Sequence, residues 1–80
     1  MQANSMNSDH LIRMANQIGV FFESMPDRKE AMEGFATHLK KFWDPRMRLA
    51  FLQLVDDEAS SAQINEMVRS AVREHRGLLA

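Results

Sequence analysis

The sequence predicts an all-α fold, a small helical bundle of three tightly linked helices with a fourth helix at the C-terminal end. Apolar side chains recur every three or four positions through four segments, which is the spacing of one helix face. Each segment also starts beside a residue that commonly caps a helix N-terminus. No stretch alternates between apolar and polar residues as a half-buried strand does. Because 80 residues make one domain, we treat residues 1–80 as a single helical domain.

The first predicted helix begins after Ser8 and ends at Pro26. Its apolar positions fall in one stripe about 100° wide. They are Leu11, Met14, Ala15, Ile18, Phe22 and Met25, with Phe21 at the edge. Gly19 flanks this stripe, although a glycine costs about 1 kcal/mol in a helix interior. We therefore expect a neighbouring helix to approach closely at Gly19; the alternative is that the helix simply tolerates the glycine. The polar residues 1–8 are expected to form a flexible tail, without the features of a secretory signal.

The second predicted helix covers residues 28–43. Asp27, followed three residues later by Glu30, forms the pattern in which each side chain binds the other residue's backbone N–H. One face carries the apolar positions Met32, Phe35, Ala36, Leu39, Phe42 and Trp43. Positive side chains gather in the last turns, where they complement the helix dipole. We expect the apolar face to pack in the core.

The third predicted helix starts at a sharp corner, Asp44-Pro45, and runs to about residue 55. Proline loses no hydrogen bond at a first helical position, and an aspartate before it can accept hydrogen bonds from free backbone N–H groups. The link to the preceding helix has almost no slack, so the corner should be rigid. It carries Trp43, Arg46 and Arg48, either as a hinge in the core or as a docking surface.

Two apolar sides distinguish the third helix. Its core stripe consists of Met47, Ala50, Phe51, Leu54 and Val55. Leu49 and Leu52 project well away from that stripe. Either the fourth helix covers this second side, or the side is a surface that awaits a partner.

The fourth predicted helix covers residues 60–77 and follows an acidic linker. Ser60 with Gln63 forms another capping pattern, and Gly77 suits the position just after a helix end. A narrow seam of mostly small side chains runs along it: Ile64, Val68, Ala71, His75 and Leu78. Such a seam fits packing on its own chain or on another.

The motifs argue against catalysis within this chain. There is no cysteine, and His10, His38 and His75 lie in different helices without metal-ligand spacing. No glycine-rich phosphate loop and no calcium-loop pattern occurs. We therefore expect no catalytic, cofactor-binding or metal-binding residue in this chain.

The net charge and the length of the chain limit the classes of partner that we expect. The net charge is −1, so nothing global indicates nucleic acid. Lys40, Lys41, Arg46 and Arg48 form a basic cluster, but the residues that follow are apolar rather than base-reading.

No apolar run approaches the roughly 18 residues of a membrane span. A chain this short buries only about 60–65% of its unfolded surface, so association with itself or with a partner is an open way to add stability. We expect a cytoplasmic location.

Two runs of the sequence resemble the delta subunit of soluble NAD-dependent formate dehydrogenases. They are Met-Ala-Asn-Gln-Ile-Gly within residues 10–22 and Phe-Trp-Asp-Pro-Arg-Met-Arg within residues 38–48. The resemblance covers residues 9–55, the family-like helical core, and says little about residues 56–80. It implies a non-catalytic accessory subunit, without a cofactor of its own, that binds and stabilises or helps assemble a cytoplasmic formate dehydrogenase complex. In that family the catalytic subunit carries a molybdenum or tungsten pterin and oxidises formate. Iron–sulfur clusters and a flavin, FMN, on companion subunits pass the electrons to NAD.

The candidates for binding partner subunits are Asn16, Gln17, Trp43, Arg46, Arg48, Leu49 and Leu52. Asn16 and Gln17 are expected on the outward face of the first helix. Arg46 and Arg48 can make charge-assisted contacts to carboxylates or carbonyl groups of a partner. Trp43 is a residue type enriched in interface hot spots, although we expect its ring to point inward. The alternatives are a stand-alone helical module with a regulatory or nucleic-acid-binding role, and a small homo-oligomer that closes its own apolar faces.

Overall fold

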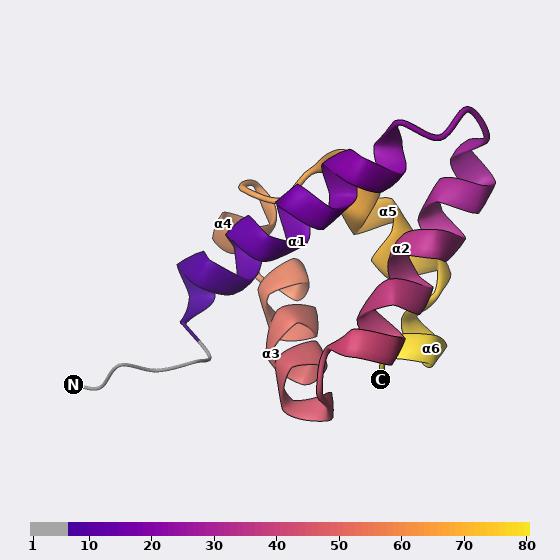
Figure 1. Ribbon diagram of the computed structural model, residues 1–80. Coiled ribbons are helices and arrows are strands. Elements are labelled where there is room, and N and C mark those ends of the chain that lie inside the picture. The colour runs from indigo at the N-terminus through magenta and orange to yellow at the C-terminus, as the bar shows by residue number, and fades with distance from the viewer. Residues whose placement is uncertain (1–6) are drawn as a thin grey trace.

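The computed structural model describes residues 7–80 and confirms the all-α prediction (Figure 1). These residues form six helices and no strand: α1 (Ser8–Glu23), α2 (Arg28–Phe42), α3 (Pro45–Asp56), α4 (Glu58–Ser61), α5 (Glu66–Glu74) and α6 (Arg76–Leu79). Of the predicted tail, residues 1–6 lie outside the described residues, and Ser8 already belongs to α1. The three linked helices of the prediction correspond to α1, α2 and α3.

Side-chain caps start these three helices. Asp27 caps α2 through hydrogen bonds from two backbone N–H groups, at 2.9 and 3.2 Å. Asp44 caps α3 by accepting the Met47 N–H at 3.0 Å, and Pro45 occupies the first helical position. Asn7 caps α1 in the same manner. The predicted capping aspartates are confirmed, and each fixes where a helix begins.

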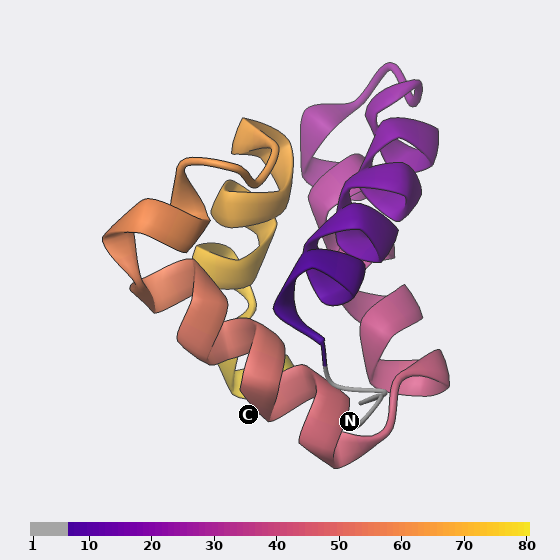
Figure 2. The ribbon, with the colours of Figure 1, turned by 90° about the vertical axis from the view of Figure 1, so that its left-hand side faces the viewer.

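The helices lie in two groups around one apolar core. α1 and α2 contact each other, and α5 packs against both of them. Figure 2 shows α1 and α2 on one side and α4, α5 and α6 on the other, with α3 crossing below. α3 contacts α1, α5 and α6, and α6 also contacts α2. The C-terminal helices are therefore part of the same core as the first three.

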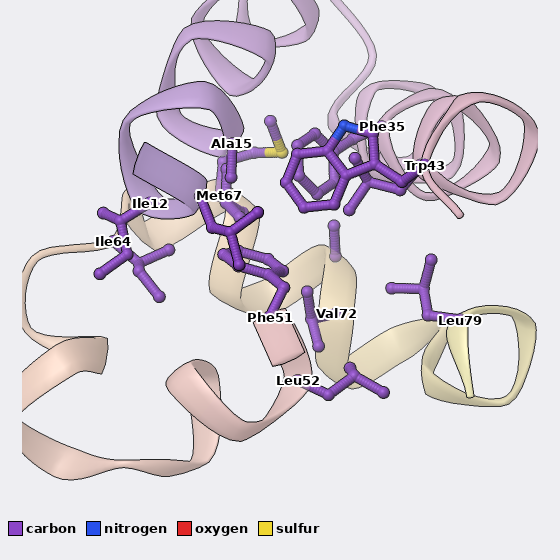
Figure 3. Close-up of a cluster of buried hydrophobic side chains, with 14 residues drawn as sticks. Ile12, Ala15, Phe35, Trp43, Phe51, Leu52, Ile64, Met67, Val72 and Leu79 are labelled. Carbon is purple, nitrogen blue, oxygen red and sulfur yellow. The ribbon is translucent and has the colours of Figure 1, made fainter. Parts of the chain in front are cut away.

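The α2–α3 corner supplies an aromatic contact to the core. Trp43 is buried, and its ring meets Phe51 nearly edge-on with the ring centroids 5.6 Å apart (Figure 3). Phe35, Leu11, Leu39 and Met67 are fully or almost fully buried in the same cluster. The expectation that the Trp43 ring points inward is confirmed.

The second apolar side of α3 is only partly covered. Leu52 is buried in the cluster that includes Val72 of α5 and Leu79 of α6 (Figure 3). Leu49 stays 51% exposed. The C-terminal helices thus cover this side at Leu52 and leave Leu49 at the surface.

The prediction of a single C-terminal helix over residues 60–77 is wrong. The segment forms α4, α5 and α6, with a turn between the first two and a break at His75. Asp57 rather than Ser60 caps α4, since its side chain accepts the Ser60 N–H at 3.0 Å. His75 leaves the helical conformation, with φ −120° and ψ 31°. This bend redirects the chain so that Leu79 is buried in the core.

Gly19 marks a close approach of α1 and α5. A Cβ atom built on Gly19 would lie 2.5 Å from Cγ2 of Val68, closer than real Cβ contacts. Val68 is buried and β-branched, so its methyl group has little freedom to rotate away. The predicted close approach at Gly19 is confirmed. A Cβ atom on Gly77 in α6 would meet nothing within 4 Å.

Two ion pairs join helices at the described surface. Arg76 of α6 binds Asp56 at the end of α3 through hydrogen bonds of 3.0 and 2.6 Å. Arg28 of α2 binds both carboxylate oxygens of Glu66 in α5 at 2.8 Å. The hydrogen bonds from Arg76 lower the pKa of Asp56. Those from Arg28 and then Ser70 lower the pKa of Glu66.

We predict that Gly19→Ala lowers the free energy of unfolding by about 1–3 kcal/mol, because the added methyl group overpacks the α1–α5 contact. Gly77→Ala is the matched control, and it should raise the free energy of unfolding by up to about 1 kcal/mol because alanine favours a helix. Urea denaturation followed by circular dichroism measures both values. Equal stabilities of the two variants would contradict the close packing at Gly19.

We predict that Asp56→Asn melts at a lower temperature than the wild type at neutral pH and that the difference disappears in acid. The pKa of Asp56 is lowered on folding, so its stabilising effect is present above the ordinary value of 3.8 and is lost as the pH falls through the folded value. Thermal unfolding from about pH 7 down to about pH 2 measures the difference. Glu33→Gln, an exposed carboxylate outside both ion pairs, is the control. A difference that is the same at every pH would disprove the linkage.

Candidate functional site

The corner between α2 and α3 sorts neighbouring side chains to opposite sides. α2 ends at Phe42, and Trp43 takes an extended conformation with φ −93° and ψ 138°. Asp44 is also extended, because the following proline disfavours the helical region. The Trp43 ring is buried, whereas the Phe42 ring is largely exposed. Two consecutive extended residues therefore decide which of these rings a partner can reach.

Arg48 closes the corner from within. Its guanidinium donates hydrogen bonds to the backbone carbonyl oxygens of Lys40 at 3.2 Å, Trp43 at 2.8 Å and Leu79 at 3.3 Å. Carbonyl groups in a last helical turn lack partners within the helix, and a cation there also complements the dipole. Arg48 thus uses donors of its guanidinium to hold carbonyl groups of this chain, and the expectation that it contacts a partner stays a prediction.

Asn16 also acts within the chain. Its side-chain amide donates to the carbonyl of Gln63 at 3.0 Å and accepts from the N–H of Asn65 at 2.9 Å. The Asn65 side chain donates in turn to the backbone carbonyl of Asn16 at 3.3 Å. These bonds satisfy the backbone of the turn between α4 and α5. The expectation that Asn16 lies on an outward face is therefore wrong.

Three of the seven candidate residues remain at the surface. Gln17 and Arg46 are exposed, and Leu49 is about half exposed. Trp43 and Leu52 are buried in the core. Gln17, Arg46 and Leu49 are consequently the most exposed of the candidates, and partner binding by any of the seven stays a prediction.

A further surface feature, which we call the aromatic stripe, was not predicted from the sequence. It consists of Phe21, Phe22, His38 and Phe42, whose successive ring centroids lie 5.1, 5.9 and 4.8 Å apart. Its end rings are open to solvent, with Phe21 69% and Phe42 71% exposed. The prediction that Phe42 lies in the core is wrong, because Trp43 turns inward at the end of α2 and Phe42 is left outside.

Gly34 allows the two helices to build this stripe. A Cβ atom on Gly34 would lie 2.7 and 2.9 Å from two ring carbons of Phe22, so Phe22 packs directly on α2. His38 and Phe42 follow Gly34 at intervals of four residues, which places all three on one side of a helix. This spacing, opposite the Phe21-Phe22 pair of α1, is the sequence signal that reveals the stripe.

Charged side chains neighbour the stripe residues along the sequence. Lys41 precedes Phe42 and Arg46 follows the corner, and both are exposed. Glu23 follows Phe22 and is also exposed. Positive side chains therefore flank Phe42 along the chain.

Two hollows of the described surface include no residue of the aromatic stripe. One of about 440 Å³ is lined by four carboxylates together with Lys29, Met32 and His75. The other, of about 350 Å³, includes Arg13, Asn16 and Ile12. Within residues 7–80 no three His, Asp or Glu side chains are grouped as metal ligands. No helix in that range is long and apolar enough to cross a membrane.

We predict that Arg48→Ala lowers the free energy of unfolding by about 1–3 kcal/mol, because helix-end carbonyl groups lose their hydrogen bonds. Arg46→Ala, the matched control at the same corner, should change it by no more than about 0.5 kcal/mol. Chemical denaturation of the isolated chain measures both variants. If Arg48→Ala is as stable as Arg46→Ala, the bridging role of Arg48 is refuted.

Comparison with known proteins assigns a family. A family model described as NADH-dependent formate dehydrogenase delta subunit FdsD matches residues 10–72. The matched residues include the aromatic stripe, the α2–α3 corner and most of α5. No curated protein and no solved structure matches the chain.

Proposed function

Because the chain belongs to the NADH-dependent formate dehydrogenase delta subunit family, we propose that it is a non-catalytic accessory subunit. In this role it binds the catalytic and electron-transfer subunits of a cytoplasmic formate dehydrogenase and stabilises the complex or helps to assemble it. The observation that carries the proposal is the family match over residues 10–72. The molybdenum or tungsten pterin, the iron–sulfur clusters and the FMN are assigned to companion subunits.

The use of polar side chains supports binding rather than chemistry. Asn16, Arg48 and Arg69 are half-buried, and their side-chain hydrogen bonds go to backbone groups of this chain. Side chains that hold the backbone in place are not free to bind or activate a substrate. Gln17, Arg46 and Leu49 stand at the surface and are proposed as contact residues.

A stabilising role follows from the linkage between folding and binding. An 80-residue chain has a small core, so its own stability is limited. A partner that binds only the folded chain stabilises that chain, and by reciprocity the folded chain stabilises the bound form of the partner. Mutual stabilisation of this kind is the simplest role for an accessory subunit that catalyses no reaction itself.

We predict that the full chain elutes with the companion subunits of formate dehydrogenase when all are expressed together and one companion is tagged. Leaving the chain out should lower the melting temperature of the purified complex. A binding partner present at 100 times its Kd raises the free energy of unfolding of the protein that it binds by about 2.7 kcal/mol. An unrelated helical protein of similar size is the control for non-specific retention. If the chain never elutes with its companions, even at low salt, it is not a subunit. NADH formation from formate by the isolated chain would refute the non-catalytic role.

A further inference from the structure

We propose that the aromatic stripe is the face by which this chain docks, and that it enters an apolar recess rimmed by carboxylates on a companion subunit. The inference rests on the proposed function, since it names the contact by which the accessory subunit is held. It adds Phe21 and Phe42, which are absent from the sequence-based candidates, as the anchoring residues.

The exposure of the stripe requires a covering surface. Single apolar side chains are common on protein surfaces, but here the exposed Phe21 and Phe42 rings are joined by Phe22 and His38 into one patch. Aromatic side chains are also the type that dominates the binding energy of interfaces. The stripe is therefore more than isolated surface rings.

The rings are held in place before a partner arrives. Phe22 lies against the backbone of α2 at Gly34, and the side chains of Phe21 and His38 each contact its ring. Phe42 in turn packs beside His38. Aromatic side chains held in this way lose little conformational freedom on binding, which favours affinity.

A companion subunit fits the stripe better than a second copy of this chain. The chain belongs to a family described as a formate dehydrogenase subunit, so the proposed function already requires a face that meets another subunit. The two hollows described above are lined mainly by charged and amide residues, so neither offers a wholly apolar recess to a phenyl ring of a second copy. The occupant should therefore be a different chain that presents the complementary recess.

Charge specifies the rim of that recess. Lys41, next to Phe42 in the sequence, and Arg46, just past the corner, are exposed, and the ion pairs within residues 7–80 involve neither of them. The nearest carboxylate in sequence, Asp44, caps α3. Carboxylates on the partner would pair with these two cations and orient the chain as it docks.

The variants for the test have matched controls. Phe21→Ser and Phe42→Ser remove the two exposed rings. Val20→Ser removes an apolar side chain that is 61% exposed on the same helix but lies on the other side of α1. Lys41→Glu is compared with Lys40→Glu, which makes the same charge change in the same helical turn but on another side of α2.

The experiment measures the Kd of the full chain for the formate dehydrogenase complex purified without it. Phe21→Ser and Phe42→Ser should each weaken binding about 30-fold, the size of a hot-spot effect, and Val20→Ser no more than about threefold. Lys41→Glu should weaken binding about tenfold at low salt and less at high salt, whereas Lys40→Glu should bind within about threefold of the wild type. Each isolated variant should keep the thermal unfolding curve of the wild type.

Three outcomes overturn the inference. Wild-type affinity of the two Phe variants, or a loss no larger than that of Val20→Ser, refutes docking through the stripe. An isolated chain that is a dimer in light scattering, and that Phe42→Ser converts to a monomer without change in the Kd for the complex, assigns the stripe to a second copy. Absence of binding by the wild type refutes the proposed function itself, and the inference with it.

Discussion

The hydrogen bonds of Arg48 are the constraint on which the arrangement of this bundle depends. One guanidinium binds carbonyl groups at the end of α2 and the carbonyl of Leu79 in α6, so it joins the middle of the chain to its C-terminal end. With the end of α2 held, Trp43 enters the core against Phe51. Phe42, one residue earlier, is then left outside. The same contact therefore determines both the packing of the core and the chemistry of the outer surface.

A second polar contact positions the other half of the molecule. Asn16 holds the backbone of the turn before α5 through Gln63 and Asn65. Gly19, one turn further along α1, leaves room for Val68 of α5. These hydrogen bonds fix where α5 begins. Because Gly19 has no side chain, α5 can pack closely on α1. α5 can then cover the inner faces of α1 and α2, which leaves their outer faces free for recognition.

The division between inside and outside suits an accessory subunit of the formate dehydrogenase delta family. In the small core of a short chain, each polar group taken from water needs its own hydrogen-bonding partner. Here those polar groups serve the fold, and aromatic rings with flanking cations remain on the surface. In the role that we propose, such a surface would recognise another protein by shape, apolar contact and charge.

The sequence by itself determined the helical class, the bounds of α1, α2 and α3 to within a residue or two, and the family resemblance. These depend on local signals, since Asp27 and Asp44-Pro45 act within one helical turn. Only the tertiary structure decided the roles of Arg48 and Asn16, whose partners lie as far as 31 and 49 residues away in the sequence. It also decided the division of the C-terminal segment into three helices and the exposure of Phe42. The physical reason is that periodicity identifies a helix face, whereas long-range hydrogen bonds and the path of the chain at a corner determine which side chains that face buries.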